Sequence, residues 1–146
     1  MLIGLNPILS PDLLFTLATM GHGDEIAVVD ANFPGDSCGQ RMIRLDGLSA
    51  TAVVEAILTV MPLDDFVAEP AHAMEVVGNP DTVPEAVAEF QAIIDRTADH
   101  PVAIASLERF DFYARAREAY AIVQTGERRL YGNLILTKGV VRPSDG

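Results

Sequence analysis

Short apolar runs alternate along this chain with longer segments of helical periodicity. Residues 25–31 read Glu-Ile-Ala-Val-Val-Asp-Ala, which is typical of a buried strand, whereas 10–20 and 49–61 place apolar residues three and four positions apart. Strands that alternate with helices predict an α/β layered fold in which a largely parallel sheet is flanked by helices. In such sheets the loops at the carboxyl ends of the strands tend to hold the functional site.

Capping residues and breakers give the approximate boundaries of these elements. Ser10 followed by Pro11 is a favourable helix start, Gly21 is placed to end that helix, and Ser49 and Pro84 open two later ones. No repeat or linker divides the chain, so we expect one domain spanning residues 1–146. Helices are expected at 10–20, 49–61, 84–96 and 112–118, strands at 25–31, 41–45, 73–77, 102–107, 119–124 and 133–138, and a loop at 32–40.

Charge and hydropathy exclude several classes of protein. The chain has 10 Lys and Arg against 21 Asp and Glu, a net charge of −11, which argues against nucleic acid and against an anionic membrane surface as partners. No stretch approaches the ~18–20 apolar residues of a membrane span. The first twenty residues lack Lys and Arg and contain Pro7 and Pro11, unlike a secretory signal, so a cytoplasmic protein is expected.

The remaining composition points to an oligomer. Cys38 is the only cysteine, which excludes a disulfide framework and a cysteine-based zinc site. Charged residues are 21% of the chain and the mean hydropathy is +0.24, which is apolar for a protein of this size. We expect part of this apolar surface to be buried between subunits.

His22 is the first candidate for chemistry. It lies in Gly21-His22-Gly23-Asp24-Glu25, between an expected helix and an expected strand, and glycines on both sides leave its ring accessible. An imidazole gives or takes protons near neutral pH. On pattern alone, a surface histidine beside a helix terminus is the more common arrangement. The pattern supports a metal site formed by His22, Asp24 and Asp30 even less, because zinc usually has more than one nitrogen or sulfur ligand.

Asp30 and the segment 107–115 are further candidates. Asp30 ends an apolar strand, where a carboxylate can accept hydrogen bonds from two hydroxyls of a polyol, although an aspartate there more often caps a loop. In 107–115, a strand leads into a short helix, so that Arg109, Phe110 and Tyr113 could converge on a cavity. The alternative is that Phe110 and Tyr113 pack in the core while Arg109 pairs with an acid.

The segment 125–133 is the last candidate. Thr125-Gly126-Glu127 predicts a turn, and Gly132 would let Tyr131 and Asn133 approach a ligand closely. An ordinary connection with a glycine bulge is the alternative. Arg128 and Arg129 are expected to face solvent. Asp64 and Asp65, which follow Met-Pro-Leu, are by themselves expected only to form a loop.

The order and spacing of these segments resemble a known family. The matching pieces are 9–11, 13–14, 20–26, 30–34, 43–48, 108–110, 112–113, 125–127, 131–136 and 138–140. Together they resemble the ribose pyranase and fucose mutarotase family. His22-Gly23-Asp24 and Tyr131-Gly132-Asn133 match its fucose branch, since the ribose branch typically has His-Thr-Asp and Tyr-Ala-Asn. Residues 68–101 are the least family-like.

The resemblance implies a function and a set of site residues. It implies an isomerase that interconverts the α and β anomers of a free aldose, L-fucose in this branch, without cofactor or metal. It also implies a homo-oligomeric ring, commonly a decamer, with sites near subunit contacts. His22 would be the proton donor, and the substrate-binding residues would be Asp30, Asp64, Arg109, Tyr113, Tyr131, Gly132 and Asn133.

Three alternatives remain open on the sequence. The same chemistry could act on another sugar, as in the pyranose–furanose exchange of a ribose pyranase. The chain could be a non-catalytic monosaccharide-binding protein, or an acidic oligomerisation module. The catalytic base is also open between Tyr113 and Tyr131, acting directly or through water, because an ordinary tyrosine is a poor base at neutral pH.

Overall fold

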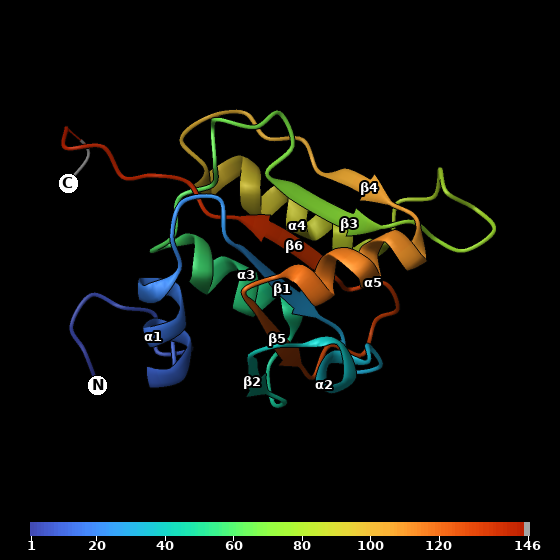
Figure 1. The fold of residues 1–146 in the computed structure, drawn as a ribbon, viewed down its shortest axis with the longest axis horizontal. Coiled ribbons are helices and arrows are strands. Elements are labelled where there is room, and N and C mark those ends of the chain that lie inside the picture. The colour runs from blue at the N-terminus through green and yellow to red at the C-terminus, as the bar shows by residue number, and fades with distance from the viewer. Residues whose placement is uncertain (145–146) are drawn as a thin grey trace.

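A computed structural model describes residues 1–144 of the chain, and its elements follow the expected alternation of helices and strands (Figure 1). The sheet has six strands in the order β2-β5-β1-β6-β3-β4. The elements in chain order are α1 (Pro11–Thr19), β1 (Glu25–Val29), α2 (Gly35–Cys38), β2 (Met42–Leu45), α3 (Ala50–Leu58), β3 (Ala71–Met74), α4 (Glu85–Thr97), β4 (Ala105–Leu107), α5 (Arg109–Glu118), β5 (Ala121–Thr125) and β6 (Leu134–Thr137).

The prediction of a largely parallel sheet flanked by helices is confirmed, with one antiparallel member. β1 pairs in parallel with β5, β5 with β2, and β3 with β4. β6 lies between β1 and β3 and runs antiparallel to both, which makes the sheet mixed. The carboxyl ends of the five parallel strands therefore meet the amino end of β6 at one edge, which we call the carboxyl edge.

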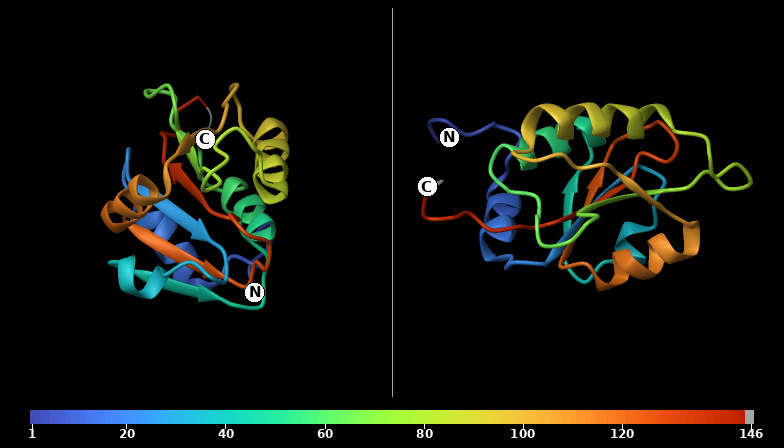
Figure 2. Two further views of the ribbon diagram at one scale, coloured as in Figure 1. Left: turned by 90° about the vertical axis from the view of Figure 1, so that its right-hand side faces the viewer. Right: turned by 90° about the horizontal axis from the view of Figure 1, so that it is seen from above.

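Helices cover both faces of the sheet. Side chains of α1, α3 and α4 pack against one face, where Phe90, Leu13 and Ile57 are fully buried or nearly so. Phe112 of α5 and Cys38 of α2 pack against the other face in a smaller cluster. Figure 2 shows α3 and α4 on one side of the strands and α5 on the opposite side. In residues 1–144, no helix is long and apolar enough to cross a membrane.

Local capping explains where the helices begin. Ser10 Oγ accepts a hydrogen bond from the Leu13 N–H at 3.2 Å, and Ser49 Oγ does the same for Ala52. Glu108 accepts from the Phe110 N–H at 2.9 Å, so α5 begins at Arg109 rather than at the predicted Phe112. α2 lies within the stretch expected to be a loop and was missed; it has four residues and no side-chain cap.

Candidate functional site

A cleft of about 330 Å³ opens at the carboxyl edge, where the sequence predicted the site. Asp30 directly follows β1, Asn133 directly precedes β6, and Arg109 and Tyr113 lie one turn apart on α5. The volume is at the lower end of the range for small-molecule pockets. The cleft is lined by Asp30, Asn32, Phe33, Met74, Val77, Arg109, Tyr113, Leu130, Tyr131 and Asn133.

Asp30 is a buried carboxylate held by its neighbours on three sides. Its Oδ1 accepts from the Asn32 N–H at 3.0 Å, its own N–H donates to Asn133 Oδ1 at 2.8 Å, and its carbonyl accepts from Gln124 Nε2 at 2.6 Å. Burial raises the pKa of the Asp30 carboxyl above its usual value, and hydrogen bonds from the Asn32 and Phe33 backbone oppose that shift. The Asn133 oxygen accepts from the Asp30 N–H, and the Asn133 side chain also hydrogen-bonds the Asp30 carboxyl. Because an amide nitrogen has two hydrogens, one remains for a ligand.

Arg109 and Tyr113 line the same cleft as Asp30 and form a polar pair. Arg109 Nε donates to the Tyr113 hydroxyl at 3.0 Å, and this hydrogen bond raises the pKa of Arg109. The Tyr113 oxygen accepts that bond, so its own hydrogen points elsewhere. The Tyr113 ring packs edge-on against Phe33, with centroids 5.3 Å apart. Phe110 is 65% exposed, so the alternative that it packs in the core is wrong.

Tyr131 enters the cleft from a backbone in the left-handed region, with φ of 61°. This conformation is unfavourable for a residue with a side chain and marks a locally constrained loop. Its hydroxyl accepts from the Val77 N–H at 3.1 Å and so joins the 131 loop to the segment after β3. Gly132 faces Glu127, whose Cγ would lie 2.7 Å from a Cβ added at position 132. The glycine is needed for internal packing.

His22 and Asp64 form a second polar cluster. His22 Nε2 lies 2.9 Å from Asp64 Oδ1, and the exposed fractions of the two side chains are 39% and 3%. The imidazole also packs edge-on against Phe66 with centroids 4.6 Å apart. A buried carboxylate that hydrogen-bonds one ring nitrogen fixes the orientation of the imidazole. The pair is suited to hold and release a proton at a solvent-accessible surface.

The main chain around Lys138 positions this pair. The Gly23 N–H donates to the Lys138 carbonyl at 2.9 Å, and the Asp64 N–H donates to the Thr137 carbonyl at 3.0 Å. The Lys138 ammonium donates to the carbonyls of Leu17 and Met20, at 2.7 and 2.6 Å, where α1 ends just before His22. One residue at the end of β6 thus fixes the loop that presents the imidazole.

A hollow of about 470 Å³ next to Asp64 contains a second histidine, His72. Arg115 pairs with Glu25 at 2.8 Å and donates to His72 Nε2 at 3.3 Å. Burial, with Arg115 as the next contributor, lowers the pKa of His72, which is only 4% exposed. His22 is therefore the histidine of this edge that is open to a ligand. Among residues 1–144, no three His, Cys, Asp or Glu side chains are grouped as metal ligands.

The two clusters lie at opposite ends of β1. His22 precedes the strand and Asp30 follows it, and in Figure 1 the β1 arrow points from the α1 side of the molecule toward α2. The four steps from Glu25 to Val29 alone span ~13 Å at about 3.3 Å per residue. Of the predicted site residues, Asp30, Arg109, Tyr113, Tyr131 and Asn133 come together, and His22 and Asp64 form a separate pair.

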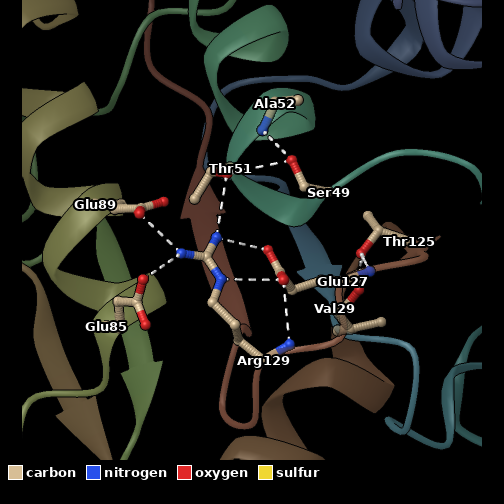
Figure 3. Close-up of polar contacts among 9 residues, drawn as sticks. All are labelled: Val29, Ser49, Thr51, Ala52, Glu85, Glu89, Thr125, Glu127 and Arg129. Carbon is tan, nitrogen blue, oxygen red and sulfur yellow. Dashed lines mark hydrogen bonds and ion pairs between the residues drawn. The ribbon is translucent and has the colours of Figure 1, made fainter.

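Arg129 is a residue whose place the sequence did not predict. It was expected to face solvent, but its side chain is 28% exposed and lies among the carboxylates of Glu127, Glu85 and Glu89 (Figure 3). A signal existed in the sequence, because Glu85 and Glu89 are four residues apart and so share one face of α4.

Comparison with known proteins gives consistent matches over nearly the whole chain. The model of the RbsD / FucU transport protein family matches residues 3–141. A human protein named fucose mutarotase is 47% identical, covering 94% of this chain and 93% of its own. A protein named L-fucose mutarotase from Haemophilus influenzae (strain 86-028NP) is 44% identical, covering 96% and 97%. The crystal structure of the fucose mutarotase from Streptococcus pneumoniae in complex with L-fucose superposes with a TM-score of 0.91 at 44% identity, covering 97% and 100%.

Proposed function

This chain belongs to the RbsD / FucU transport protein family, and from that premise we propose that it is a mutarotase that interconverts the α and β anomers of L-fucose. The observation that carries the proposal is the end-to-end likeness, in sequence and in fold, to a fucose mutarotase whose crystal structure holds L-fucose. The cleft supplies matching chemistry for a sugar, since it offers a carboxylate acceptor, an amide donor, a guanidinium and two phenols.

Mutarotation requires two proton transfers and no change of oxidation state. The sugar ring opens when a proton reaches the ring oxygen and another leaves the anomeric hydroxyl, and it closes on the other face of the aldehyde. In our proposal His22 protonates the ring oxygen while Asp64, 2.9 Å away, holds the imidazole. Positioned acid–base groups of this kind contribute about 10²–10⁴-fold to a rate.

Tyr113 is the better placed of the two tyrosines for the anomeric proton. Its oxygen lies 3.0 Å from Arg109 Nε, so a guanidinium lies directly beside the atom that would take the proton. The Tyr131 oxygen instead accepts from a neutral backbone N–H. Asp30 and Asn133 would hold the sugar hydroxyls so that the aldehyde rotates without leaving the site.

The distance between His22 and the cleft leads us to propose that two subunits complete each site. His22 of one copy would face the cleft of the next, which is a head-to-tail contact that can close into a ring, and the family resemblance suggests a decamer. Exposed apolar side chains lie on both surfaces. Phe66 and Val67 lie on the His22 side. Val77 and Leu130 line the cleft, and Phe110 packs beside Tyr113 of the cleft.

The function is tested by measuring anomer exchange with saturation-transfer NMR on a panel of free sugars. We expect L-fucose exchange to be accelerated by the wild-type protein and to lose most of that acceleration in His22→Ala, with sugar affinity nearly unchanged. His100→Ala, which removes a histidine that pairs with Asp99, is the matched control. Saturable binding without faster exchange would indicate a non-catalytic binding protein, and acceleration confined to D-ribose would indicate pyranose–furanose chemistry.

Subunit sharing is tested by complementation. The His22→Ala and Asp30→Ala proteins should each be inactive. When the two variants are mixed in equal amounts and exchange subunits, about one site in four combines an intact His22 with an intact cleft. The mixed rings should therefore regain about a quarter of the wild-type activity. No recovery after confirmed subunit exchange would contradict a shared site.

A further inference from the structure

One arginine that the proposed reaction does not use ties the 126–133 loop to the rest of the molecule. Arg129 Nε and Nη2 lie 3.1 and 2.9 Å from the two carboxylate oxygens of Glu127. Its Nη1 lies 2.8 Å from Glu89 Oε1 on α4, and Nη2 reaches Thr51 Oγ1 on α3 at 3.5 Å (Figure 3). The planar guanidinium thus joins the loop to two helices.

The loop-side partner, Glu127, depends on this arginine. It is 5% exposed, and a carboxylate that is buried requires a partner to remain charged. The hydrogen bonds from Arg129 hold the pKa of Glu127 below its usual value, and the same contacts raise the pKa of Arg129. Without the guanidinium, the Glu127 carboxylate would keep backbone donors such as the Ala50 N–H but lose the cation that lies between it and Glu89 and Glu85, so we expect the loop to shift.

Glu127 is also in contact with the backbone that presents the sugar-binding residues. Its carbonyl accepts from the Ala31 N–H at 2.8 Å, directly after Asp30. Its Cγ would lie 2.7 Å from a Cβ added at residue 132. The adjacent Tyr131 has the left-handed φ of 61°, and such a conformation persists only where the surrounding contacts hold it.

We propose that Arg129 is a positioning residue for sugar binding, which acts through Glu127 to hold the 126–133 loop in its binding conformation. The inference rests on the proposed function and adds to it a residue that does not touch the sugar. Because His22 acts from the other edge of the sheet, the role of Arg129 is expected in affinity and not in the proton-transfer step.

The test compares Arg129→Gln with Arg128→Gln. Arg128 is the adjacent residue of the same type, is exposed, and lies outside the ion cluster. We expect Arg129→Gln to raise the KM for L-fucose about tenfold with kcat within about twofold of wild type, and Arg128→Gln to leave both unchanged. Arg129→Lys should give an intermediate KM, because it restores the charge without the two-pronged geometry.

Hydrogen exchange of the Ala31 amide reports on the loop independently of any sugar. Its protection should fall in Arg129→Gln and persist in Arg128→Gln, since the amide donates to Glu127. A wild-type KM in Arg129→Gln, an equal KM increase in both variants, or unchanged Ala31 protection would each overturn the inference. If Arg129→Gln does not fold, Glu89→Ala removes the shorter of the two contacts from Arg129 to α4 and leaves the one to Glu85 at 3.5 Å. It should raise KM about two- to threefold, and an unchanged KM there would likewise overturn the inference.

The two proposals fail in different ways. A wild-type protein that does not accelerate L-fucose exchange would refute the proposed function. The Ala31 measurement, with equilibrium binding of L-fucose in place of KM, would then still decide whether Arg129 holds the loop.

Discussion

Gly132→Ala measures how tightly the 126–133 loop is packed. An added Cβ would lie 2.7 Å from Glu127 Cγ and 3.6 Å from Asp30 Cβ. Carbon atoms in ordinary contact are ~3.5–4.0 Å apart, so the substitution requires a displacement of roughly 0.8 Å or more. Glu127 is buried and held on both carboxylate oxygens by Arg129, so we expect the loop rather than Glu127 to move.

The size of the effect follows from this displacement. Overpacking by one methyl group costs about 1–3 kcal/mol, which corresponds to a decrease of roughly 3–12 °C in Tm for a domain of this length. Misplacing a substrate-binding group by about 1 Å can reduce a rate by about 10²-fold. We therefore expect the exchange of L-fucose anomers to be slowed about 10- to 100-fold in Gly132→Ala.

Gly47→Ala is the matched control. No atom lies within 4 Å of a Cβ added at position 47, and its φ is outside the left-handed region, so alanine should leave activity unchanged and Tm equal or slightly higher. Saturation-transfer NMR measures the exchange rate, and thermal unfolding measures Tm. Wild-type exchange and Tm in Gly132→Ala would refute the argument that Glu127 leaves no room for a side chain.

Three other perturbations test separate contacts. The pKa of Asp30 is raised by burial, so its carboxylate should take up a proton with a midpoint above the usual pH of 3.8. The KM for L-fucose should therefore rise on acidification around that higher midpoint. A midpoint at or below 3.8 would contradict the effect of burial. The pKa of Glu127 is lowered in the folded state, so this carboxylate stabilises the fold above about pH 4.5, its usual pKa, and the stabilisation is lost as the pH falls through the lower folded-state value. Denaturant unfolding at a series of acidic pH values should show this loss in wild type and not in Glu127→Gln. Lys138→Met leaves the carbonyls of Leu17 and Met20 without their cation, so it should lower stability by about 1–3 kcal/mol and reduce kcat more than affinity; an effect on KM alone would place the role of Lys138 elsewhere.

The elements that sequence patterns predicted best are those with local signals. The helices that begin after Ser10 and Ser49 combine a capping side chain with an apolar stripe, and both were placed within a few residues. The strand predicted at 73–77 is β3 at Ala71–Met74 instead, because its limits are set by pairing with β6 and β4. α2 has too few residues to show any periodicity.

The cleft was predictable in part because strand ends are predictable. Asp30 follows one strand and Asn133 precedes another, and the apolar runs of both strands are clear in the sequence. The two residues lie at the same edge of the sheet because β6 runs antiparallel to β1. Arg129 was not predicted because its partners are Glu127, two residues away, and Glu89, forty residues earlier. A pair of adjacent arginines is usually solvated, and only the packing of α4 beside the loop distinguishes Arg129 from Arg128.

The separation of His22 from Asp30 follows from the strand prediction itself. Eight positions in a helix would place two side chains about 12 Å apart, but the intervening residues form β1, which leads from one edge of the sheet to the other. The roles that we propose for His22 and Asp30 therefore place a proton donor and a sugar ligand too far apart to contact one monosaccharide within a single chain. If both residues act in mutarotation, the fold itself therefore requires a second copy of the chain at the cleft, and the exposed Phe66 and Leu130 lie on the two surfaces that such a contact would cover.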